Sequence, residues 1–156
     1  MTDYHRSPVL KHALWISFMG SISLTMVPMI NMLALPVIYD AMFATGFTMG
    51  GLGLVAYNAP SEQFIMWEGF LSMALAGMVG LSVLSMFRPS PMLTNIWLYG
   101  GLLLFSAYVL YDTQKLMKNA KTRPTWDPIN ESFGLYMDAI NLFIRFAMMF
   151  NNNKKK

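Results

Sequence analysis

The sequence predicts an all-α membrane protein, a polytopic bundle of transmembrane helices. Of its 156 residues 55% are hydrophobic and only 12% are charged, whereas a soluble domain usually carries about 25% charged residues. Between Lys11 and Arg88 the only acidic or basic side chains besides His12 are Asp40, Glu62 and Glu68. The apolar runs do not alternate, and their length of about 20 residues suits a membrane-spanning helix rather than a barrel strand.

Five spans are expected, because prolines and turn-forming residues divide the chain into five apolar segments. Ser61 in "NAPSE" is predicted to cap the third helix, and Asp127-Pro128 to be the N-cap and first residue of the last. A polar connection, "KLMKNAKTRPTWDPINE", separates the last two spans. The spans are placed at residues 12–31, 37–57, 64–87, 92–114 and 132–150, between an N-terminal tail (1–11) and a basic C-terminal tail (151–156).

The basic residues indicate how the bundle is oriented, and they form no arginine-aromatic stripe that would favour nucleic acid as a partner. Five spans put the termini on opposite sides, and the side with the polar connection carries more basic residues, so we expect that side to face inward. With no cysteine, disulfides and thiolate metal sites are excluded. The small-residue pairs Gly46/Gly50 and Gly77/Gly80 favour helix packing within the chain, with a dimer contact as the alternative.

Ionisable residues inside spans are costly in a bilayer and are therefore functional candidates. Asp40 lies near the start of its span, where the helix dipole favours an anion, so an interfacial position is expected. His5 and His12 are expected at the interface as well. Glu68, one turn inside the third span, is either interfacial or lines a pathway.

Asp112 in "LLLFSAYVLYDTQK" and Asp138 in "YMDAIN" are the strongest candidates. Asp112 is near a helix C-terminus, where the dipole disfavours an anion, and aspartate is too short to reach water as lysine does. Asn141 and Arg145 follow Asp138 on one stripe of its helix. We expect Arg145 to extend toward the C-terminal face, and Asn141 to form a hydrogen bond to another helix.

The two aspartates approach the polar connection from consecutive antiparallel helices at similar shallow depth, so they meet if those helices face each other. Two carboxylates in contact in a low-dielectric medium cannot both ionise cheaply, and therefore share a proton. Deprotonated, the same pair offers oxygen ligands to a cation such as Ca²⁺. The sequence therefore predicts a pH-sensing and ion-binding pair, at which protons and a cation compete.

The segments "YGGLLLFSAYVLYDTQK" and "DPINESFGLYMDAINLFIRF" resemble the C-terminal end of the transmembrane Bax-inhibitor-motif family, and "NAPSEQF" is most similar to its mitochondrial branch. The resemblance implies a seven-helix fold whose last five helices match this chain, and pH-dependent exchange of Ca²⁺ or K⁺ for protons at Asp112 and Asp138. It also implies the mitochondrial inner membrane, membrane organisation and control of apoptosis. In the family, the second helix supplies an arginine to the aspartate pair, and no residue of this sequence matches it. A mitochondrial presequence is not recognised either. Both observations suit a shortened form of the family's fold, or a chain that a partner completes.

Two other functions are weighed against an exchanger. A membrane scaffold or apoptosis regulator would act through membrane-protein partners or an oligomer and transport nothing. No enzyme is predicted, since HExxH, GxSxG, Walker and Cys/His patterns are absent from the sequence. The motifs of paired-aspartate intramembrane proteases are only half matched, because the glycine pattern before Asp138 is missing.

Overall fold

The computed structural model describes residues 6–60 and 62–155, and within these ranges the chain is helical without strands. The long helices are α1 (Pro8–Asn31), α2 (Leu35–Asn58), α3 (Glu68–Phe87), α4 (Pro91–Thr122) and α5 (Pro128–Lys154), and a single 3₁₀ turn, η1 (Ile65–Trp67), leads into α3. The all-α fold class is thus confirmed. The expected cap at Ser61 and the position of His5 lie outside the described residues.

Proline marks the beginnings of the helices. A proline occupies the first or second position of α1, α2, α4 and α5, where its missing N–H is not needed for a helical hydrogen bond. The predicted cap of the last helix is confirmed, because the Asp127 carboxylate accepts hydrogen bonds from the backbone N–H groups of Ile129 and Asn130.

Four of the five long helices are long and apolar enough to cross a membrane, namely α1, α3 with its preceding 3₁₀ turn, α4 and α5. The prediction of five such spans is therefore wrong by one. The exception is α2, because Asp40, four glycines and two threonines reduce its hydropathy although it has 24 residues. The protein is therefore an integral membrane protein in which four apolar helices pack with a fifth, less apolar helix, α2.

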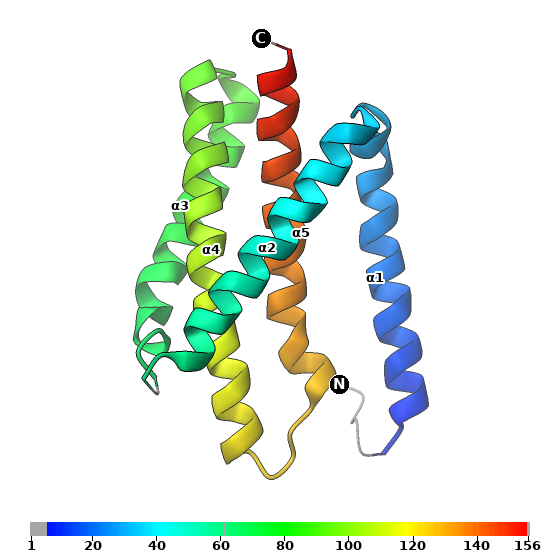
Figure 1. Ribbon diagram of the computed structural model, residues 1–156, viewed down its shortest axis with the longest axis vertical. Helices are drawn as coiled ribbons and strands as arrows, with labels where there is room; N and C mark the ends of the chain where they lie inside the picture. The colour runs from blue at the N-terminus through cyan, green and yellow to red at the C-terminus, as the bar shows by residue number, and fades with distance from the viewer. Residues whose placement is uncertain (1–5, 61, 156) are drawn as a thin grey trace.

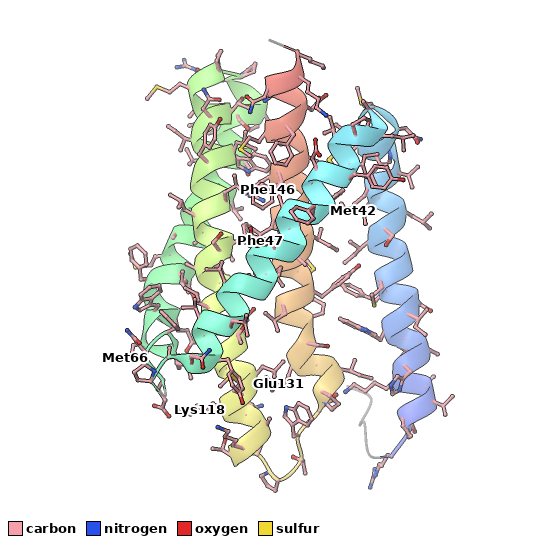
Figure 2. All side chains as sticks on the ribbon, in the orientation of Figure 1. Met42, Phe47, Met66, Lys118, Glu131 and Phe146 are labelled. Carbon is pink, nitrogen blue, oxygen red and sulfur yellow. The ribbon has the colours of Figure 1, made fainter. Side chains whose placement is uncertain are left out.

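The bundle is built around α4 and α5, which pack against each other along much of their length, and α2 crosses both at a slant (Figure 1). α3 packs on α4, and α1 has its main contact with α5 alone. The start of α1 and the end of α5 lie at opposite ends of the bundle (Figure 1). Outward-facing side chains are mostly apolar, as Met42 and Phe47 of α2 illustrate (Figure 2).

α4 continues well past the predicted end of its span. The helix ends at Thr122 rather than near residue 114, so most of the basic half of the polar connection is helical and only residues 123–127 join α4 to α5. At 1.5 Å per residue the 32 residues of α4 extend roughly 48 Å. This length exceeds the hydrocarbon core of about 30 Å, so the last turns of α4 project beyond it.

The glycine pairs do not mediate close helix packing within the chain, contrary to expectation. A Cβ atom added at Gly46, Gly50, Gly77 or Gly80 would meet no atom of another element within 4 Å. The glycines in close contact are instead Gly101 of α4 and Gly134 of α5, where an added Cβ would overlap a charged side chain of the opposite helix.

Candidate functional site

A cavity of about 410 Å³ lies between α3, α4 and α5 and contains the charged residues singled out in the sequence. The wall from α3 is apolar apart from Ser82, and the aromatic residues come from α4. Its lining residues are Leu75, Met78, Val79, Ser82, Trp97, Phe105, Tyr108, Asp112, Gly134, Met137, Asp138, Asn141 and Arg145.

Asp112 and Asp138 lie side by side in this cavity, and their carboxyl groups interact directly. Asp112 is ten residues before the end of α4 at Thr122, and Asp138 is ten residues after the start of α5 at Pro128. Because antiparallel helices on either side of a short turn rise equally per residue, equal spacing from the turn brings both residues to one level, about 15 Å along the helices.

A glycine makes room for the first of the two carboxylates. The side chain of Asp112 rests against the backbone of Gly134, one turn before Asp138 on α5, and a Cβ at that position would overlap the Asp112 carboxylate. Any larger residue at position 134 would therefore force Asp112 away from its partner.

Asp138 is the more deeply buried member of the pair, with 3% of its surface exposed. Its Oδ2 is one of three buried side-chain atoms in the described ranges that have no hydrogen-bond partner. A hydrogen bond between two carboxyl groups requires a proton on one of them, and the unpaired oxygen can accept a further proton or contact a cation. The arrangement can thus hold a proton or a cation in the same place.

Arg145 and Asn141 are oriented differently from the sequence-based expectation. Arg145 does not extend toward the C-terminal face; it is 3% exposed, and its Nη1 donates to the backbone oxygen and Oδ1 of Asn141 at 3.2 and 3.1 Å. The Asn141 amide donates to the Met137 carbonyl of its own helix, not to another helix. Both side chains therefore belong to the cavity wall.

The guanidinium of Arg145 lies over two aromatic rings of α4. Its central carbon is 4.3 Å from the centre of the Trp97 ring and 4.6 Å from that of Phe105, distances at which the ring faces attract a cation. Its Nε lies against the backbone of Gly101 and has no hydrogen-bond partner. Sequence reasoning missed this position, although the glycine pair in "LYGGLLLF" and the aromatic residues one turn to either side are visible in the sequence.

Glu68 does not line the cavity that contains the aspartate pair. It is exposed at the start of α3, close enough to Tyr111 for a side-chain hydrogen bond. The ammonium of Lys115 donates to the Tyr111 hydroxyl at 3.0 Å, and its charge acts on both Glu68 and Asp112. These polar groups lie between the aspartate pair and the end of the bundle at which α2 joins α3.

The other ionisable candidates are outside the cavity. Asp40 is exposed and pairs with Lys154 at 3.2 Å, which joins α2 to the end of α5. His12 is exposed on α1, with its Nδ1 2.7 Å from the Pro8 carbonyl oxygen. Within the described ranges, no group of three or more histidine, cysteine, aspartate or glutamate side chains is placed to hold a metal ion. The pair therefore offers two carboxylates to a cation and no third acidic ligand.

Comparison with known proteins relates this chain to one family of membrane proteins. The model of the family Bax1-I, described as inhibitor of apoptosis-promoting Bax1, matches residues 1–155. The growth hormone-inducible transmembrane protein of Rattus norvegicus is 37% identical over 99% of this chain and 48% of its own length. The inner membrane protein YbhL of Escherichia coli is 30% identical over 70% of the chain and 50% of its own length. Bax inhibitor 1 of Drosophila melanogaster is 23% identical over 77% and 49%.

No solved structure matches the chain. The chain spans about half the length of these three relatives. The family match extends over almost the whole sequence, including the two segments that contain Asp112 and Asp138. The chain therefore belongs to the Bax1-I family of membrane proteins, a membership consistent with a role in the regulation of apoptosis.

Proposed function

We propose that this protein is a pH-sensitive cation/proton exchanger or leak channel of the mitochondrial inner membrane, with Ca²⁺ or K⁺ as the cation. Asp112 and Asp138 bind the proton and the cation in turn. The observation that carries the proposal is the direct contact of these two carboxyl groups in a largely apolar cavity. The placement in mitochondria, and the link to membrane organisation and apoptosis, are supported by the resemblance of "NAPSEQF" and "YDTQK" to the mitochondrial branch of the family.

Competition at the pair determines the direction of the pH effect. When a proton is shared, the pair carries one negative charge instead of two, so a cation is bound more weakly. As the pH rises, the proton leaves, both carboxylates ionise and the cation is attracted. Cation flux is therefore expected to fall as the pH is lowered on the side from which the pair is reached.

The test uses the purified chain in liposomes that contain indicators for Ca²⁺, K⁺ and pH. Asp112→Asn and Asp138→Asn should each abolish the pH-dependent flux, because an amide neither ionises nor exchanges a proton. Asp40→Asn is the matched control, since Asp40 is an exposed aspartate outside the cavity, and it should leave the flux unchanged. Unchanged flux and pH response in both pair variants would contradict the proposal.

A non-transporting scaffold or apoptosis regulator is the second candidate. It is supported by α1, which has its main contact with α5 alone, and by an apolar groove of about 440 Å³ between α1 and α5. A protein of this kind would show no flux in liposomes. In cells that lack the endogenous protein, the double variant Asp112→Asn/Asp138→Asn would then restore mitochondrial morphology and resistance to apoptosis as well as the unsubstituted chain does.

A further inference from the structure

Arg145 is held as a fixed positive charge in the same cavity as the aspartate pair. Its guanidinium lies between the rings of Trp97 and Phe105, against Gly101, with Nη1 bonded to Asn141. It forms no ion pair with any residue in the described ranges. Burying an arginine in a bilayer without a counter-ion is costly, so this position requires an explanation other than stability.

One edge of the guanidinium is closed to any ligand. Its unpaired Nε faces the backbone of Gly101 on α4, where no room remains for another atom. The nearest acidic side chain on its own helix is Asp138, seven residues earlier and about 10 Å along the axis. No ion pair joins Arg145 to an acidic residue of the described ranges, so its charge can reach the aspartate pair only through the electric field across the cavity.

We infer that Arg145 determines the valence preference of the pair, so that Asp112 and Asp138 bind a monovalent cation in preference to a divalent one. This inference rests on the proposed function. With both carboxylates ionised and Arg145 charged, the cavity has a net charge of one negative unit. A monovalent cation makes it neutral, whereas a divalent cation leaves one uncompensated positive charge in a low-dielectric site.

The ligands available at the pair agree with this preference. Ca²⁺ takes six to eight oxygen ligands, typically with several carboxylates among them. Here the two aspartates are not joined by a third acidic residue within the described ranges. Lys115 and Glu131 also act on Asp112, but their charges are opposite in sign and stay the same in every variant proposed below.

The expected size of the effect follows from Coulomb's law. At about 10 Å and an effective dielectric constant of about 20, one unit charge changes the affinity for a monovalent cation roughly tenfold and that for a divalent cation roughly a hundredfold. Removing the charge of Arg145 should therefore raise the ratio of Ca²⁺ to K⁺ affinity roughly tenfold. Both affinities should increase, that of Ca²⁺ more.

The experiment measures binding of K⁺ and of Ca²⁺, each alone, to the purified detergent-solubilised chain by titration calorimetry at alkaline pH. Arg145→Gln removes the charge, Arg145→Lys keeps it, and Arg88→Gln removes an exposed arginine outside the cavity. Arg145→Gln should raise the Ca²⁺-to-K⁺ affinity ratio roughly tenfold, and the other two should leave it near that of the unsubstituted chain. Gly101→Ala, which displaces the guanidinium without removing it, should change the ratio and serves if Arg145→Gln does not fold.

The outcomes separate this inference from the proposed function. In one outcome, cation binding depends on Asp112 and Asp138 while the Ca²⁺-to-K⁺ affinity ratio is unchanged in Arg145→Gln and Gly101→Ala. That result would overturn the inference about Arg145 and leave the proposed function intact. The same change of ratio in Arg145→Lys as in Arg145→Gln would overturn it too, because charge would not be the cause. If neither cation binds in a way that Asp112→Asn abolishes, the proposed function fails, and the inference with it.

Discussion

Each of two charged side chains in the cavity rests on a glycine of the neighbouring helix. Asp112 of α4 lies against Gly134 of α5, and Arg145 of α5 lies against Gly101 of α4. On each helix the glycine and the charged residue are eleven residues apart, which is about three turns and hence the same face. Both contacts therefore fit the same antiparallel register of α4 and α5. Because the two glycines have no side chain, each leaves room for a charged side chain of the opposite helix.

Substitution at Gly134 should disrupt the pair without removing a carboxylate. A methyl group in Gly134→Ala would overlap the Asp112 side chain, so we expect Asp112 to turn away from Asp138 and the pH dependence of flux to be lost. The measurement is cation flux in liposomes over a series of pH values from acid to alkaline, since a proton shared by two carboxyl groups is lost as the pH rises. Gly80→Ala, at which an added Cβ meets nothing within 4 Å, is the control and should retain the pH dependence; equal behaviour of the two variants would show that the glycine is not needed.

The residues of the pair could be predicted from the sequence because a carboxylate within an apolar run is costly wherever its helix lies. The position of Arg145 could not be predicted in the same way. Its side chain turns back toward the N-terminus of α5 only because Gly101, Trp97 and Phe105 of another helix accept it. The sequence of α5 alone is equally compatible with an arginine that extends to the nearer membrane surface.

At the level of elements, polar contacts near the turn hold the α4–α5 hairpin in register. Glu131 at the start of α5 accepts from Asn119 at 2.7 Å and from Arg123 at 3.3 Å, and Figure 2 shows Glu131 at this end of the bundle. Asp127 caps α5 and also pairs with Lys11 of α1. These contacts keep two arms of the hairpin aligned, namely the part of α4 from Asp112 to Thr122 and the part of α5 from Pro128 to Asp138.

Asp127→Ala should lower the free energy of unfolding by about 1 kcal/mol through the lost N-cap, with a further loss because buried Lys11 is left without its partner. Asp127→Asn keeps the capping oxygen and loses only the ion pair, so it should be intermediate. The measurement is unfolding of the purified chain by denaturant in mixed micelles. Identical stability of the alanine and asparagine variants would mean that the cap contributes nothing.

Gln114 should be essential to the turn between α2 and α3. It is buried, accepts from the Phe64 N–H at 2.8 Å and donates to the Pro60 carbonyl at 3.0 Å. Gln114→Leu leaves these backbone groups unpaired, at a cost of about 1–3 kcal/mol for a buried group. Hydrogen exchange at Phe64 should accelerate, whereas in Gln63→Leu, an exposed position, it should not. Unchanged exchange at Phe64 in Gln114→Leu would show that the turn holds without this side chain.

The helices themselves could be predicted from the sequence more reliably than their ends. Span boundaries read from hydropathy describe where the bilayer ends, whereas α4 continues because lysine, leucine, methionine and alanine all favour helix. It stops at Thr122, just before Arg123-Pro124, since a residue that precedes proline is disfavoured in the helical conformation. The close packing expected of Gly46 and Gly50 is absent because α2 turns those glycines away from its neighbours.

For the whole molecule, the helix arrangement predicts which ends face the same side of the membrane. The start of α1 and the turn between α4 and α5 are joined by the Lys11–Asp127 pair, and α5 ends at the opposite end of the bundle (Figure 1). This arrangement is the one expected if α2 crosses the membrane together with the four more apolar helices, and this is a prediction that labelling can test.

Because the chain has no cysteine, single cysteines can report this topology directly. Ser7→Cys, before α1, and Thr125→Cys, in the turn between α4 and α5, should both react with an impermeant maleimide from one side of sealed vesicles. Asn152→Cys, at the end of α5, should react from the other side. The prediction is checked by labelling before and after permeabilisation. Labelling of Ser7→Cys and Asn152→Cys from the same side would contradict it and would leave α2 on the surface.

The equal spacing of the two aspartates from the turn has a consequence for how such chains can vary in length. An extra residue within 123–126 lengthens a connection and leaves both helices as they are. An extra residue between Asp112 and Asn119 would rotate the carboxylate by about 100° relative to the hairpin contacts, out of the cavity. Insertions and deletions among natural variants should therefore be tolerated in the connection and excluded from the two arms, so that residue counts alone identify chains that keep the pair.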